Sequence, residues 1–216
     1  MDYFAYISRN KVDMLYEQLP ESLINELSIE SEKESSIDLG IETTMGFTQW
    51  LPSILAKASY GRKGKIIYGR KIKETYAHKL EIVLLNLKKQ NCIIDFDRCT
   101  EDNLAKIDYI FYDGEFTADM SKATYGEDGD ICGYVTIKSE LHIGDKLYPL
   151  ILDCSLPFFS DTRNEKYYLH SGNIAFLERG VPERFRTVIK LTRLYNNTIF
   201  GSPLFLSHDS SSSQGF

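Results

Sequence analysis

Apolar positions recur with two different periods along the chain, and the change falls near residue 91. Residues 9–19 place apolar side chains at the three- and four-residue spacing of an amphipathic helix. Residues 73–90 show the same spacing with a wider apolar face, which predicts a helix buried on two sides. A strand is predicted at residues 3–8, where aromatic and β-branched side chains cluster.

Beyond residue 91 apolar and polar residues alternate, which is typical of strands that bury one face. Turn signals rich in Gly, Asn and Asp separate the alternating segments. The predicted strands cover residues 92–96, 108–118, 130–140, 146–155, 166–177, 185–194 and 198–206. Strands at such close spacing indicate an antiparallel sheet or a partly closed barrel.

Together the two periods predict an α+β fold, with a helical N-terminal half packed on an antiparallel β-sheet or partly closed barrel in the C-terminal half. We expect a single domain over residues 1–209, mainly helical over 1–91 and β-rich over 92–209. Residues 28–43 are polar and acidic, which predicts a mobile connection. The serine-rich residues 210–216 predict a disordered tail.

Composition narrows the class of protein. A net charge of −6 disfavours a nucleic-acid partner, because nucleic-acid binders are usually basic. The chain has no apolar run long enough to cross a bilayer and no secretory signal at its start, so we expect a cytoplasmic protein without a membrane span. The 4 cysteines form no C-x-x-C pair, so we expect reduced thiols, no local zinc site and no cofactor.

The strongest local signal is a basic stretch at residues 60–73, with the sequence YGRKGKIIYGRKIK. Arginine and lysine hold phosphate groups, and a tyrosine ring stacks on a nucleotide base. The predicted ligand-binding residues are Tyr60, Arg62, Lys63, Lys65, Tyr68 and Arg70. The alternative is a solvated basic edge that balances the acidic residues 28–43, since charge runs are more often of that kind.

A second candidate site is a set of carboxylates: Asp95, Asp97, Asp108, Asp113, Glu115 and Asp119. In strands, residues two apart share a face, and paired carboxylates bind Mg²⁺ or perform acid–base catalysis. A restriction-type nuclease would also need an acid two residues before Lys138, where Thr136 stands. The competing interpretation is a set of solvated strand faces and turns.

Other catalytic patterns are incomplete. His170 and Ser171 are neighbours in a predicted strand and would point to opposite faces, which rules out a simple relay. Cys154 lies in an apolar strand, so we expect an inert buried thiol. We therefore predict no catalytic and no metal-binding residue, and the balance is against an enzyme.

The opening residues YISRNKVDMLYEQL fit the pattern Y-[I/L]-S-x-x-K-V-x-x-L-x-x-Q, and the segment FGSPLFL near the end contains G-[S/T]-P-L. In both respects the chain resembles a group of uncharacterised bacterial proteins. Some members of that group look like accessory proteins of bacterial conflict or antiviral systems. The resemblance transfers no activity and no site residue.

Three hypotheses follow. The first is a non-enzymatic binding or sensor module that regulates another component by recognising an anionic small molecule, such as a nucleotide, or a partner protein. The second is a divalent-metal-dependent hydrolase or nuclease that uses the carboxylates of residues 95–119. The third is a structural homo-oligomeric subunit with an apolar patch around Phe47 and Trp50.

Overall fold

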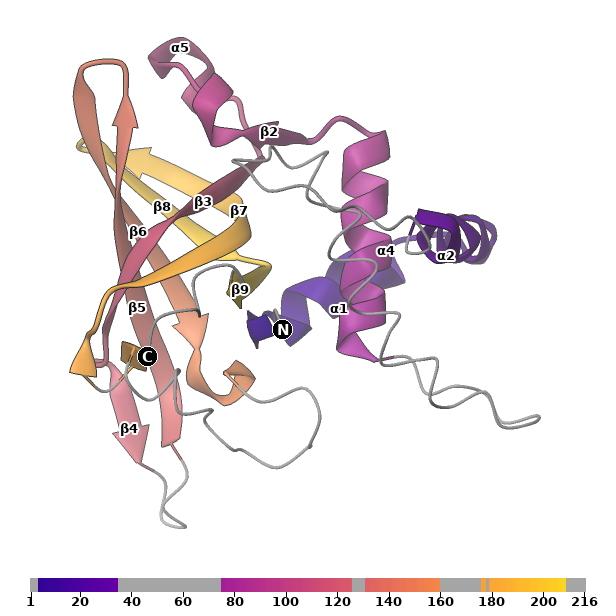
Figure 1. Cartoon of the computed structure of the whole chain (residues 1–216), viewed down its shortest axis with the longest axis horizontal. Helices are drawn as coiled ribbons and strands as arrows, with labels where there is room; N and C mark the ends of the chain where they lie inside the picture. The colour runs from indigo at the N-terminus through magenta and orange to yellow at the C-terminus, as the bar shows by residue number, and fades with distance from the viewer. Residues whose placement is uncertain (1–3, 35–74, 126–130, 160–175, 178, 209–216) are drawn as a thin grey trace, which may run out of the picture. The chain divides into compact units, whose positions relative to one another are not determined.

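The computed structural model describes residues 4–34, 75–125, 131–159, 176–177 and 179–208. The chain divides into two compact units, one made of Met1–Ser8 with Ile94–Phe216 and the other of Arg9–Ile93. The second unit is helical and the first is dominated by strands, so an α+β composition with mainly N-terminal helices is confirmed (Figure 1). Within the described ranges, no helix is long and apolar enough to cross a membrane.

The helical unit contains α1 (Arg9–Glu17), α2 (Glu21–Glu34) and α4 (Tyr76–Lys89). Both α1 and α2 pack against α4, whose apolar residues from Leu80 to Leu87 are buried. The predicted mobile connection at residues 28–43 is wrong over its first part, because residues 28–34 belong to α2. The Ser28 hydroxyl there donates to the carbonyl oxygen of Ile24 at 2.8 Å, one turn earlier.

Capping sets the ends of α4 inside the predicted range of residues 73–90. Thr75 precedes the helix, and its Oγ1 accepts from the backbone N–H of His78 at 3.3 Å. Asn91 takes a left-handed φ of 53°, and the N–H of Cys92 then donates to the carbonyl of Leu87 at 3.0 Å. A hydrogen bond from an N–H to the carbonyl five residues earlier is typical of a Schellman C-cap.

The strands of the other unit are β1 (Phe4–Ile7), β2 (Ile93–Asp95), β3 (Tyr109–Asp119), β4 (Ala123–Tyr125), β5 (Ile131–Ile143), β6 (Lys146–Ser155), β7 (Glu183–Tyr195), β8 (Thr198–Pro203) and β9 (Phe205–His208). Short helical segments accompany them, among them η1 (Phe96–Arg98), α5 (Glu101–Leu104) and η2 (Leu156–Phe158). The strand predicted at residues 166–177 is wrong at its end, since Phe176 and Leu177 are helical, and its remainder lies outside the described residues.

Five of the strands close into a barrel, in the order β3-β5-β6-β8-β7 and back to β3 (Figure 1). Of the two predicted arrangements, an antiparallel sheet or a partly closed barrel, the structure has a barrel, and its strands are antiparallel except β6 and β8, which run parallel with Leu150 opposite Ile199. This strand order with one parallel pair is that of the OB-type barrel, a five-stranded Greek-key barrel.

The inward-facing residues of the barrel form one apolar core. It includes Phe116, Ile137, Leu150, Phe185 and Ile189, each almost fully buried. Cys154 is also fully buried, as expected. Gly201 allows β7 and β8 to approach closely here, since a Cβ at that position would lie 2.7 Å from Ile189 Cγ2 and 2.9 Å from the carbonyl oxygen of Lys190.

Candidate functional site

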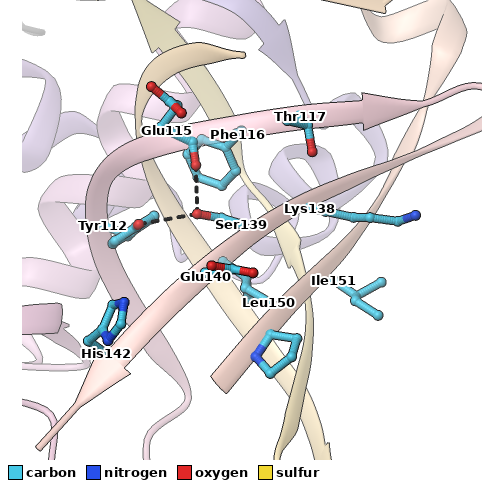
Figure 2. Close-up of a pocket in the computed structure, with 11 residues that line it drawn as sticks. Tyr112, Glu115, Phe116, Thr117, Lys138, Ser139, Glu140, His142, Leu150 and Ile151 are labelled. Carbon is cyan, nitrogen blue, oxygen red and sulfur yellow. Dashed lines mark hydrogen bonds between the residues drawn. The ribbon is translucent and has the colours of Figure 1, made fainter. Parts of the chain in front are cut away.

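The barrel wall opens where the pairing between β3 and β5 ends. Residues Tyr109–Phe116 of β3 pair with β7, whereas Thr117–Asp119 pair with Lys138–Thr136 of β5. Beyond Lys138, β5 continues to Ile143 along β6. The result is a groove of about 560 Å³ over β3, β5 and β6 (Figure 2).

Gly114 shapes the end of the groove at Tyr112 and Ser139, which is called its inner end. The Tyr112 ring lies across the position that a side chain at residue 114 would fill, so a Cβ there would be 2.2 Å from Tyr112 Cζ and Oη. A strand can fold an aromatic side chain back over its own backbone only where the covered residue has no side chain. Gly114 therefore permits the ring to face Ser139 of β5 rather than solvent.

A hydrogen-bonded relay joins the two strands at this point. The Ser139 hydroxyl donates to the carbonyl oxygen of Glu115 at 2.6 Å, since a carbonyl can only accept. That hydroxyl has one proton, so the Tyr112 hydroxyl must be the donor in its 3.2 Å contact with Ser139 (Figure 2). Burial raises the pKa of Tyr112, which keeps this donor protonated.

Aromatic rings support Tyr112 from both sides. Its centroid lies 5.3 Å from that of Phe96 in η1 and 5.5 Å from that of Phe116, both edge-to-face. Phe116 in turn lies 6.1 Å from Phe185 in β7. These spacings are favourable for aromatic pairs, so the groove's inner end rests on a continuous packed row.

The walls of the groove carry polar side chains, two of them carboxylates, that have no partner within the described residues. Glu115 of β3 and Glu140 and His142 of β5 are exposed and line it. None of the three side chains has a hydrogen bond or ion pair within the described residues. Pro149 and Ile151 of β6 add apolar surface beside them, and Ile151 is labelled in Figure 2.

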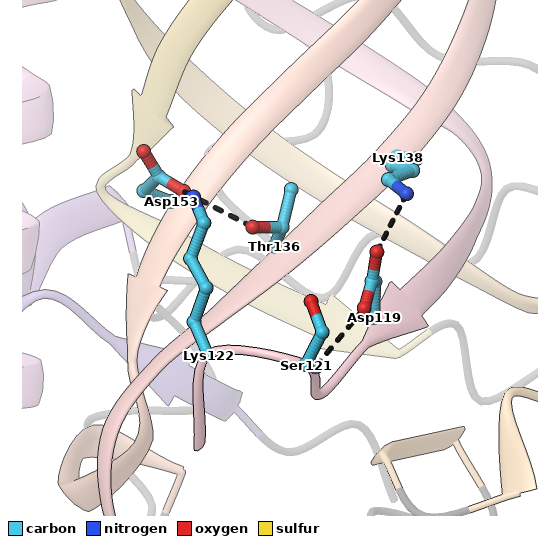
Figure 3. Close-up of polar contacts among 6 residues, drawn as sticks. All are labelled: Asp119, Ser121, Lys122, Thr136, Lys138 and Asp153. Atoms are coloured by element: carbon cyan, nitrogen blue, oxygen red, sulfur yellow. Dashed lines mark hydrogen bonds and ion pairs between the residues drawn. The ribbon is translucent and has the colours of Figure 1, made fainter. Parts of the chain in front are cut away.

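Other acids on the barrel strands are paired, one of them with Lys138, which also lines the groove. Lys138 Nζ lies 2.7 Å from Asp119 Oδ2, and Lys122 Nζ lies 3.2 Å from Asp153 Oδ1 (Figure 3). The Lys138 hydrogen bond holds the pKa of Asp119 well below its usual range. Thr136 Oγ1 also donates to Asp153 at 3.2 Å.

Two further acids of the barrel unit are also paired. Asp113 of β3 is held by two arginines of β7, with Arg184 Nε at 2.8 Å and Arg186 Nε at 3.1 Å. At the β5–β6 hairpin, Lys146 Nζ lies 2.5 Å from Glu101 Oε2 of α5. Among the acids of β3, β5 and β6, Glu115 and Glu140 are therefore the ones without a partner within the described residues.

The carboxylates proposed for a metal-dependent hydrolase do not assemble. Within the described residues, no three His, Cys, Asp or Glu side chains lie close enough to hold a metal ion. Asp97 falls in η1 rather than in a strand, so it does not share a strand face with Asp95. Asp113 and Asp119 are already bonded to arginine and lysine.

The predicted ligand-binding residues, from Tyr60 to Arg70, lie outside the described residues. Phe47 and Trp50 lie outside them as well. Of the groove residues, the sequence pattern points to Glu115, as a metal ligand, and not to Glu140, His142 or Tyr112. A usable signal is the segment ELH at residues 140–142, where polar residues flank one apolar residue on a strand.

Comparison with known proteins adds one match. The model of a "Family of unknown function (DUF7019)" matches residues 2–43, a range that covers β1, α1 and α2. No curated protein and no solved structure matches the chain. The match does not reach the barrel, so what the groove does must be argued from its own chemistry.

Proposed function

We propose that the chain is a non-enzymatic binding module that regulates another component by holding a partner protein in the groove between β3 and β5. One observation carries the proposal: Glu115 and Glu140 line the groove without an ion pair within the described residues, while the other acids of β3, β5 and β6, which are Asp113, Asp119 and Asp153, are paired. Protein interfaces combine polar and apolar contacts, and opposite charges fix the partner and its register. The unpaired carboxylates beside the apolar surface of Pro149 and Ile151 fit this description.

The barrel type supports the same location. OB-type barrels bind their ligands on the face of the second and third barrel strands, which here are β5 and β6. A shared fold does not carry a shared ligand, so the ligand class must come from the site. Carboxylates repel phosphate, and this disfavours the nucleic acids that many such barrels bind.

Recognition of an anionic small molecule stays a prediction for a different part of the chain. It rests on the basic residues Arg62, Lys63, Lys65 and Arg70 with Tyr60 and Tyr68. The acidic groove would disfavour an anion, so the two binding roles require separate sites and separate tests.

Photo-crosslinking in the native host tests the groove. Thr117 is exposed on the groove wall, and Tyr195 is 62% exposed on the same barrel but outside the groove. We expect Thr117→p-benzoylphenylalanine to give a discrete protein adduct that the Glu140→Lys change weakens, and Tyr195→p-benzoylphenylalanine to give none. An adduct from Tyr195 alone, or equal labelling from both positions, contradicts the proposal.

A further inference from the structure

One edge of β5 is only partly used. Along that edge β5 pairs with β4 at Ile131–Gly133 and with β3 at Thr136–Lys138. In the part of the chain that the structure describes, no strand pairs with this edge over Ser139–Ile143, although the opposite edge pairs with β6 throughout. An open strand edge presents backbone N–H and C=O groups that another extended chain can bond.

The neighbouring strand β3 leaves this part of β5 unpaired. It pairs with β5 only over Thr117–Asp119, while its other partners are β7 and β2. The bonds from Tyr112 to Ser139 and from Ser139 to the Glu115 carbonyl take the place of the missing ladder at the inner end. The open edge therefore starts at a fixed point and runs outward for roughly 13 Å, at about 3.4 Å per residue.

Charges lie on both sides of this edge. Glu115 projects from β3 and Glu140 from β5, and both are exposed within the groove (Figure 2). An added strand would place alternate side chains on this face, so basic residues at every second position would reach the two carboxylates. The intervening residues would point to the opposite face of the sheet, the face on which Leu141 is buried.

We propose that the groove is a strand-addition site that takes an extended, basic segment of the partner protein, bonded to the Ser139–Ile143 edge and paired with Glu115 and Glu140. This inference rests on the proposed function and specifies its partner. Backbone hydrogen bonds supply affinity in such complexes, and the charges select the sequence.

Fluorescence anisotropy with the full chain tests the inference. The probe is a labelled, end-blocked hexapeptide of alternating lysine and valine. One control alternates glutamate and valine, and another keeps lysine and valine but methylates alternate backbone nitrogens, which removes strand bonding without changing charge. We expect the lysine probe to bind, the glutamate control not to bind, and the methylated control to bind at least about tenfold more weakly, because its ladder bonds are lost.

Two further measurements fix the location. The double change Glu115→Gln and Glu140→Gln should weaken the lysine probe at least about tenfold, whereas Asp145→Asn with Glu101→Gln, outside the groove, should leave it unchanged. Hydrogen exchange should slow at Ser139–Ile143 when the probe is bound. These two results together would place the bound lysine probe at the open edge of β5.

Equal binding of the methylated and unmethylated probes, with slowed exchange in the groove, overturns strand addition but leaves the groove as a binding site. Binding of the glutamate control overturns the charge assignment. Absence of probe binding, together with a specific adduct from Thr117, shows that the partner segment is not a basic strand. Absence of both contradicts the inference and the proposed function together.

Discussion

Tyr112 and Gly114 determine the groove at the scale of single residues. The ring of Tyr112 occupies the space above Gly114 and reaches Ser139 across the opening. Neither residue has a charge or a reactive group that would mark it in the sequence. Their roles come from a close approach of side chain and backbone that only the folded strand creates.

Replacing Gly114 with alanine should displace the Tyr112 ring. The new Cβ would lie 2.2 Å from Cζ and Oη, so we expect a loss of about 1–3 kcal/mol in the free energy of unfolding, as for other overpacked sites. Urea denaturation of Gly114→Ala, Tyr112→Ala and the double variant forms a cycle. The cost of Gly114→Ala should shrink in the Tyr112→Ala background, and strict additivity would refute the clash.

Tyr112 also predicts a pH dependence. Burial raises its pKa above the ordinary value near 10, so the folded protein holds the phenol proton more tightly than the unfolded chain. This stabilisation is complete below about pH 10 and falls as pH rises through the folded pKa. Urea melts at pH 8 and above pH 10 should show a smaller alkaline loss for Tyr112→Phe than for wild type. Identical losses would contradict this role.

Strand boundaries show what the pattern could and could not predict at the scale of elements. The limits of β6 were predicted without error, because a clean alternation lies between two turns. The segment 198–206 was predicted as one strand, yet it forms β8 and the start of β9. The register against β7 slips by one residue between Pro203 and Ser207, which is a bulge that alternation cannot reveal.

A buried threonine stabilises the backbone near that register shift. Thr187 in β7 is fully buried, and its hydroxyl donates to the carbonyl oxygen of Phe205 at 2.6 Å. Thr187→Val keeps the shape but leaves the carbonyl without this donor, so we expect a loss of about 1–3 kcal/mol in unfolding free energy. Thr192 makes an exposed bond to Phe200 at 3.2 Å. Thr192→Val is thus the matched control, and an equal effect of both changes would contradict the account.

The helical elements were predicted from period alone, except α2. Residues 21–34 carry many polar and acidic side chains and show little apolar periodicity, so residues 28–34 were taken as part of a connection. Ser28 lowers helix propensity in isolation, but here its hydroxyl bonds the carbonyl one turn earlier. Packing against α4 stabilises α2 as a helix, and the sequence pattern of α2 does not indicate this packing.

For the whole molecule, the α+β composition followed from the change of period near residue 91, because composition and alternation are local properties. Closure of the barrel depends on the pairing of β3 with β7 across more than 60 residues of sequence, and on the parallel pair of β6 with β8. Such long-range strand pairings produce no recognisable pattern in the local sequence. The groove arises from these pairings, which explains why Glu140 and His142 were not singled out.

The basic stretch yields a prediction for the intact chain. The double change Arg62→Glu and Arg70→Glu should abolish binding of a co-purifying nucleotide-sized anion, because the phosphate contacts would turn repulsive. Native mass spectrometry of protein from its host measures the bound mass. Arg98→Glu with Lys106→Glu makes the same change in charge at exposed barrel-unit positions and is the control. Unchanged anion binding in the Arg62 and Arg70 variant would refute this site.

The central claim is that the groove between β3 and β5 holds a partner protein, and hydrogen exchange on the complex isolated from the native host tests it most directly. Exchange of backbone amides is compared between the complex and the same protein after the partner is removed. We predict slower exchange in the complex at Tyr112–Thr117 and Lys138–Ile143, with little change at the β7–β8 turn around Asn196. Protection confined to other parts of the chain, with these two segments unchanged, would contradict the account.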